Sequence, residues 1–223
     1  MDDGRPLANQ VFDQLFDEIN TLKLAPGTKL SEVEVARRFG VSPQPVRDAF
    51  HRLRNIDLLL VQPQRATRVR GFSMTRINDA RFIRLSVELE VLYRACKVWD
   101  DAKDALLQAN LSAQKEAVKA DDPDSMQSLD YAFHELICDQ AGCPRAFQFI
   151  KQQKQKLDRL CVLEFDRRVR VLATVYEDHV QIAQALKSRS TAKAQSAIRK
   201  HLSGLDETIE YIYAKHQDCF EAE

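Results

Sequence analysis

Residues 27–70 read GTKLSEVEVARRFGVSPQPVRDAFHRLRNIDLLLVQPQRATRVR, and this stretch decides the fold of the first part of the chain. Ser31, with Glu34 three residues later, forms a capping box, which predicts that a helix begins at Glu32. Gly40 readily adopts a left-handed backbone and is expected to end this helix. The apolar residues between them recur at helical spacing and predict the buried face: Val33, Val35, Ala36 and Phe39.

A second helix is predicted to begin after Ser42, which is placed to act as its N-cap. Pro43 is tolerated there because the first N–H groups of a helix have no intrahelical partner. Strands are expected at residues 58–61 and 67–72, on either side of a turn. Helix, turn, helix and hairpin in this order predict a winged helix-turn-helix, whose second helix enters the major groove of DNA. The predicted buried face of that helix is Val46, Ala49, Phe50 and Leu53.

The distribution of charge supports contact with DNA. The chain has 33 basic and 33 acidic residues, so its net charge says nothing about nucleic acid. Residues 37–70, however, contain eight arginines against Asp48 and Asp57, a local charge of +6. An arginine-rich segment of this kind is usually a solvated charged face. Here the arginines coincide with the predicted helix pair and hairpin, which favours contact with DNA phosphates. The residues expected to contact DNA are Ser42, Gln44, Arg47, His51, Arg52, Arg65 and Arg68.

The pattern L-S-E-x-x-x-A-x-x-F-G-V-S-x-x-P-V-R-x-A, followed by the hairpin, resembles the GntR family of bacterial transcription regulators. The resemblance covers roughly the first 72 residues and implies that the wing lies along the minor groove. Three positions depart from the family pattern: Pro43 stands where Arg is usual, and Asp57 and Gln64 stand where Gly is common. The fold tolerates these changes, but they put a family-consensus operator sequence in question.

The length and composition suit two domains, which we assign to residues 1–72 and 76–223 with a hinge between them. The N-terminus lacks the features of a signal peptide, and no apolar run reaches the ~20 residues that cross a bilayer. The cysteines are odd in number and form no C-x-x-C pair, which is typical of reduced thiols in a cytoplasmic protein. They are Cys96, Cys138, Cys143, Cys161 and Cys219.

The second domain is predicted to be helical throughout, so the fold class is mainly α. Breaks are clearest at 121–123 and 142–144. The expected helices span 75–98, 101–120, 123–140, 143–165, 167–187 and 190–216. This is an all-α bundle of about six helices. Its aromatic core is expected to contain Trp99, Phe133, Phe147 and Phe149.

Four residues of the bundle form a candidate metal site. Asp130 and His134 are four apart and project from one face of a helix, and His179 and His201 lie on the last two helices. Helical bundles build metal sites from inward-facing residues of this kind. One Asp with three His suits zinc, nickel, manganese or iron. Spacing alone does not separate such a site from ordinary surface or hydrogen-bonded core histidines.

The segments L-D-x-x-F-H, D-H-x-x-I-x-x-A-L and R-x-H-L resemble the helical effector-binding (FCD-type) domain of the FadR-like branch of the GntR family. The resemblance implies that Asp130, His134, His179 and His201 coordinate a divalent metal, with zinc favoured. It also implies that Arg84, in an Arg…Glu…Ala pattern with Glu88 and Ala95, faces the effector cavity.

Three functions therefore stand side by side. The favoured one is a ligand-responsive transcription regulator, a homodimer that binds a short inverted repeat and is controlled by a small carboxylate held by the metal and Arg84. An alternative is a metal-dependent hydrolase or lyase of a small carboxylate, with Glu88 or Glu135 as base. The third is a DNA-binding regulator whose metal is structural or is itself the signal. Sugar acids, dicarboxylates, aromatic acids and amino acids would all suit the pocket.

Overall fold

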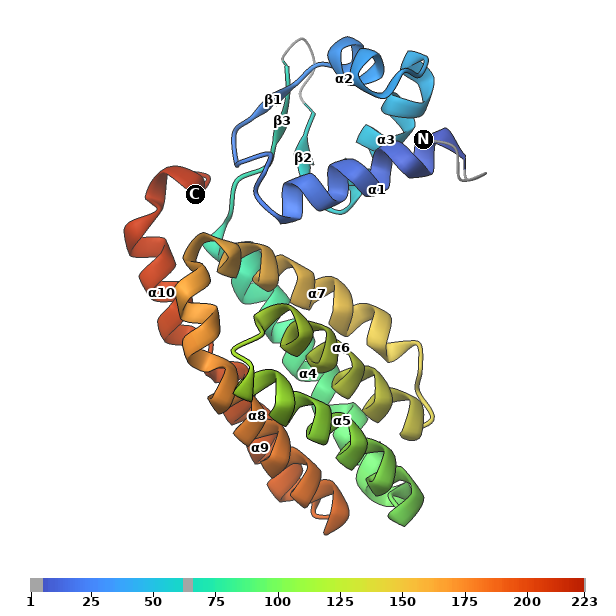
Figure 1. Ribbon diagram of the computed structural model, residues 1–223, viewed down its shortest axis with the longest axis vertical. Helices are drawn as coiled ribbons and strands as arrows, with labels where there is room; N and C mark the ends of the chain where they lie inside the picture. The colour runs from blue at the N-terminus through green and yellow to red at the C-terminus, as the bar shows by residue number, and fades with distance from the viewer. Residues whose placement is uncertain (1–5, 62–65, 223) are drawn as a thin grey trace. The chain divides into compact units, whose positions relative to one another are not determined.

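The computed structural model describes residues 6–61 and 66–222, with the side chains of 165–170 left aside. The chain forms two compact units, one comprising Met1–Arg76 with Tyr213–Glu223 and the other Ile77–Ile212. Figure 1 shows strands only in the first unit, while the second consists of helices. The mainly α fold class predicted from the sequence is thus confirmed.

The first unit is a winged helix-turn-helix. Its helices are α1 (Leu7–Asn20), α2 (Glu32–Phe39) and α3 (Pro43–Asn55), and its strands are β1 (Lys29–Leu30), β2 (Leu59–Leu60) and β3 (Thr67–Val69). The strands pair antiparallel in the order β1-β3-β2. The Ser31 side chain accepts a hydrogen bond from the backbone N–H of Glu34, and Gly40 has φ 65°. The sequence therefore predicted both ends of α2 from local chemistry.

Some local expectations for this unit need correction. Val33 was expected on the buried face of α2 but is 71% exposed. Ser42 occupies the N-cap position of α3, yet its side chain makes no capping hydrogen bond. Helix α1 and strand β1 were not assigned from the sequence. Helix α1 contributes to the core a row at helical spacing, namely Val11, Leu15 and Ile19.

The C-terminal segment packs with this first unit. Phe72 and Phe220 form a parallel bridge with their rings 5.6 Å apart. Arg76 pairs with Glu221 at 2.7 Å, and the Tyr213 ring lies edge-on to that of Phe220. The domain range 76–223 assigned from the sequence therefore includes a tail that belongs, by its contacts, to the compact unit of the winged helix.

The second unit is a helical bundle. Its elements are α4 (Met74–Val98), α5 (Asp101–Lys119), α6 (Pro123–Gln140), α7 (Ala146–Cys161), a 3-10 turn (Val162–Glu164), α8 (Phe165–Lys187), α9 (Thr191–Ser203) and α10 (Asp206–Lys215). The single helix expected over 190–216 is in fact two, so the described residues form seven α-helices from Met74 onward. The interruption falls at Gly204, where the low helix propensity of glycine weakens the helix.

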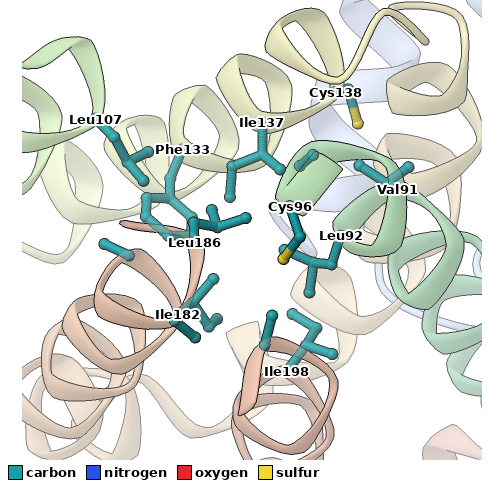
Figure 2. Close-up of a cluster of buried hydrophobic side chains, with 14 of the residues drawn as sticks. Val91, Leu92, Cys96, Leu107, Phe133, Ile137, Cys138, Ile182, Leu186 and Ile198 are labelled. Carbon is teal, nitrogen blue, oxygen red and sulfur yellow. The ribbon is translucent and has the colours of Figure 1, made fainter. Parts of the chain in front are cut away.

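Helices α4 to α9 of this unit contribute to a shared apolar core (Figure 2). Leu92 of α4, Phe133 of α6, Ile182 of α8 and Ile198 of α9 converge there, each less than 3% exposed. Trp99 and Phe147 are buried as expected, whereas Phe149 is 57% exposed. All five cysteines are free thiols. Within the described part of the chain, no helix is both long and apolar enough to cross a membrane.

Candidate DNA-binding face and metal centre

Helix α3 presents polar side chains on the face opposite its apolar core. Gln44, Arg47 and His51 are exposed, and they follow one another at helical spacing. Gln44 donates a hydrogen bond to Asp48 at 2.9 Å. Arg47 pairs with Glu32 of α2 at 2.8 Å, with more than half of its side chain exposed. The guanidinium is thus held near the surface of the helix pair, where a phosphate or base edge can compete for it.

The remaining candidates differ in their surroundings. Arg52 donates to Asn9 at 2.8 Å and lies 3.9 Å over the Phe12 ring, so it holds α1 against α3. Arg68, on β3, is exposed and donates to the carbonyl oxygen of Gly27. Ser42 is exposed at the start of α3. Arg65 lies outside the described residues.

The four predicted metal ligands converge in the interior of the helical unit. Asp130 and His134 come from α6, His179 from α8 and His201 from α9. All four are buried, and one ligand atom from each lies within 4.8 Å of those of the others. The structure thus brings together four residues that span 72 positions of sequence, from 130 to 201.

A chain of hydrogen bonds sets the tautomer of His179. The Asn110 side chain donates to the carbonyl oxygen of Leu129, which leaves its amide oxygen to accept from Gln114 at 2.6 Å. The Gln114 amide oxygen in turn faces His179 Nδ1 at 2.8 Å, so Nδ1 carries the proton. Nε2 therefore presents a lone pair, and it lies 3.2 Å from Asp130 Oδ1.

The contact between His179 Nε2 and Asp130 Oδ1 indicates whether these residues fit a metal ion. His179 Nε2 is buried without a hydrogen-bond partner. It and Asp130 Oδ1 are both acceptors, and two buried lone pairs that face each other repel unless a cation lies between them. Burial lowers the pKa of His179 to about 3, so the imidazole does not supply a proton to relieve the contact. A divalent ion bound by Asp130, His134, His179 and His201 meets this requirement.

His134 is oriented by a carboxylate. Its Nδ1 lies 2.8 Å from Glu88 Oε2, which leaves Nε2 as the nitrogen that faces the cluster. Burial tends to raise the pKa of Glu88, but its contacts with His134 and with the Arg84 guanidinium outweigh burial and lower that pKa to about 2. Glu88 is thus a fixed anion that positions other groups.

Asp130 is held from its other side by Lys154. The ammonium lies 2.9 Å from Asp130 Oδ2 and 2.9 Å from Asp158 Oδ1, and Tyr131 donates to Asp158 at 2.6 Å. Desolvation opposes ionisation of Asp130, but the positive charge of Lys154 holds the pKa of that carboxyl well below the usual range. With Oδ2 engaged by Lys154, Oδ1 is the oxygen turned toward the histidines.

A cavity of about 160 Å³ adjoins the cluster. Arg84, Asp130, Lys154 and His201 line it, and most of its surface comes from apolar atoms of α6, α8 and the α9–α10 junction. Its volume is close to the ~150 Å³ of a cavity known to hold benzene. A small organic acid can therefore lie here with its charged end at the cluster.

Several residues of the site were missed by sequence reasoning. Lys154 and Gln114 belong to no motif, and only their position on helical faces hints at inward orientation. Asp178, 3.8 Å from His201 Nδ1, was visible as the residue before His179. Their roles depend on which helices pack together, which spacing within one helix does not reveal.

Comparison with known proteins agrees with this geometry. Residues 7–69 match the family model "Bacterial regulatory proteins, gntR family", and residues 79–204 match the FCD domain. The chain is 33% identical over 219 residues to the HTH-type transcriptional repressor RspR of Escherichia coli K12, covering 98% of this chain and 96% of that protein. The chain belongs to the GntR family, in its FadR-like subfamily with an FCD domain.

Solved structures of the same fold include E. coli McbR/YncC, with a TM-score of 0.71 at 20% identity, covering 95% of this chain and 99% of that one. A putative GntR regulator from Rhodococcus sp. RHA1 gives a TM-score of 0.70 at 21% identity, covering 91% and 97%. The curated relatives are named transcriptional regulators, and this protein is a transcription regulator, not an enzyme. The site agrees, since Glu88 is bound to Arg84 and His134, and Glu135 is exposed. Neither is placed as a general base.

Proposed function

We propose that this regulator binds a short inverted-repeat operator as a homodimer, and that a small carboxylate bound at a divalent metal site controls it. The carrying observation is the 3.2 Å approach of His179 Nε2 and Asp130 Oδ1, two acceptors with no proton to share. A cation held by Asp130, His134, His179 and His201 would supply the missing attraction, and it would provide a Lewis acid for a carboxylate ligand.

The effector would enter the cavity beside this cluster. Arg84 lines the cavity and is 3% exposed, so its charge is weakly screened and attracts an anion strongly. The apolar walls would receive the body of the acid. Residues of the α9–α10 junction, Gly204 and Leu205, lie in the same wall, so an occupant contacts the start of α10.

The operator would be read by α3, with Arg47 as the principal side chain. A single winged helix covers few base pairs, and a two-fold dimer reads two half-sites. Electrostatic attraction from the arginine strip would make binding steeply dependent on salt.

The test combines metal analysis with DNA binding. Purified protein should contain about one divalent ion per chain, and a screen of organic acids on the zinc-loaded protein should give a ligand that raises its melting temperature. That ligand should then change the affinity for a genomic fragment in a gel-shift titration. Binding to DNA that is absent or insensitive to salt would contradict the DNA-binding part of the proposal.

A second candidate keeps DNA binding but makes the metal structural or the signal itself. It is favoured by the presence of four protein ligands, enough to close a tetrahedral zinc site. In that case removal of the metal would change DNA binding, and no organic acid would add to its effect.

A further inference from the structure

In the proposed metal site, Arg84 and the metal would both need the lone pair of the His134 nitrogen that faces the cluster. Nδ1 of His134 is engaged by Glu88, so a metal can use only Nε2. The same Nε2 lies 3.1 Å from Arg84 Nη2. An imidazole nitrogen offers one lone pair, which either accepts from the guanidinium or binds a metal.

One end of the Arg84 guanidinium is held by Glu88, and the other end can change its partner. Its Nε donates to Glu88 Oε1 at 2.7 Å, within the same helix, and this bond does not involve the cluster. The residue also lines the cavity next to the cluster. The outer part of the guanidinium can therefore leave His134 and turn toward the cavity while the bond to Glu88 is kept.

We propose that Arg84 is a shared group that competes with the metal for His134 Nε2, and that metal loading releases its Nη2 into the cavity as an anchor for the effector carboxylate. The metal would then bind before the effector, because Arg84 Nη2 becomes available to the carboxylate only when the metal occupies His134 Nε2. This inference rests on the proposed metal site, and it assigns Arg84 a positioning role in addition to its charge.

The proposal differs from simple repulsion between Arg84 and a metal cation. Repulsion depends on the positive charge alone, whereas competition depends on the Nη2 bond. Lysine at position 84 keeps the charge, and its Nζ ends about where Arg84 Cζ lies, one bond short of Nη2, so it can pair with Glu88 but lacks the group that reaches His134. Arg84→Lys thus separates the two explanations.

A matched control is available on the same helix. Arg94 donates through its Nε to Glu90 at 2.8 Å, with the same four-residue spacing, and both side chains are more than half exposed. Arg94→Lys makes the same chemical change away from the cluster and should leave zinc affinity unchanged.

The experiment is a zinc titration of wild type, Arg84→Lys and Arg94→Lys by competition with a chromogenic chelator at pH 7. A hydrogen bond to a charged group corresponds to about tenfold or more in an equilibrium constant, so Arg84→Lys should bind zinc about tenfold more tightly than wild type. Equal or weaker binding would overturn the proposal, because a pure charge effect predicts no change.

A crystal structure of the zinc-loaded wild-type protein gives an independent answer if Arg84→Lys proves unstable. Arg84 Nη2 should lie outside hydrogen-bond distance of His134 Nε2, and its bond to Glu88 should remain. Contact retained with Nε2 would refute the competition. Wild-type protein that binds no zinc at Asp130 and the three histidines would instead refute the proposed metal site itself.

Discussion

Loss of the metal site can be predicted quantitatively for the double variant His179→Ala with His201→Ala. A single substitution leaves three ligands, often enough to retain a metal, so two helices must each lose one. Removal of His179 also removes a ring that stacks on Phe133 with centroids 4.0 Å apart, so the variant will melt earlier for reasons of packing alone. The informative quantity is therefore the shift in melting temperature that added zinc produces.

For the wild-type protein, zinc at ~1,000 times its dissociation constant stabilises the folded state by about 4 kcal/mol. In a chain of this size each kcal/mol raises the melting temperature by about 2–4 °C, so zinc should raise it by about 8–16 °C. The double variant should show no shift, and elemental analysis should find no bound ion. His216→Ala, in the other unit, is the control and should behave as wild type. A zinc-induced shift of wild-type size in the double variant would show that the ligands have been misassigned.

Three further predictions concern DNA, assembly and pH. Arg47→Ala should weaken operator binding by about 1–3 kcal/mol in gel-shift titrations if the side chain reads a base, while Arg94→Ala should not; equal affinities would exclude Arg47 from the interface. Light scattering should give about twice the 25.6 kDa chain mass, and a monomer both on and off DNA would contradict the dimer. Burial lowers the pKa of His179 to about 3, so its neutral form contributes stability above the unfolded pKa of ~6.5 that is lost as the pH falls toward 3. In urea melts of metal-free protein, His179→Gln should therefore lose less stability than wild type between pH 7 and pH 4, and equal losses would refute the shift.

The sequence predicted the parts of the fold that local chemistry determines. Ser31 and Gly40 mark the ends of α2 because capping and a left-handed backbone depend on single residues. Asp57 stands where the family often has Gly, and it adopts the left-handed region with φ 61°, which Asp tolerates better than most residues. Helix α1 was missed because no cap side chain marks its start after Pro6. The division of the last expected helix depends on Gly204, which a periodic pattern does not detect.

The residues of the candidate site also fall into two groups, those that the sequence predicted and those that it could not. Asp130 and His134 are four residues apart on one helix, so their common face could be predicted from spacing. That His179 and His201 join them was implied by the family resemblance, because spacing within one helix does not show it. Lys154 and Gln114 could not be predicted, because their contacts with Asp130 and His179 require the packing of α7 against α6 and of α5 against α8. Lys154 lies 24 residues from Asp130 in the sequence, and Gln114 lies 65 residues from His179. The pattern of residues along a single helix does not indicate partners at such separations.

The bridge between Phe72 and Phe220 makes the first unit discontinuous in the sequence. During synthesis, Tyr213–Glu223 leaves the ribosome only after the whole of Ile77–Ile212, so the nascent winged helix waits for the helical unit before its last contacts form. A fragment cut at Arg76 would lack Glu221, the partner of the Arg76 guanidinium, and the backbone carbonyl of Cys219 that accepts from the N–H of Phe72. The DNA-binding unit is thus an assembly of the two ends of the described chain, and dissection at the linker divides it.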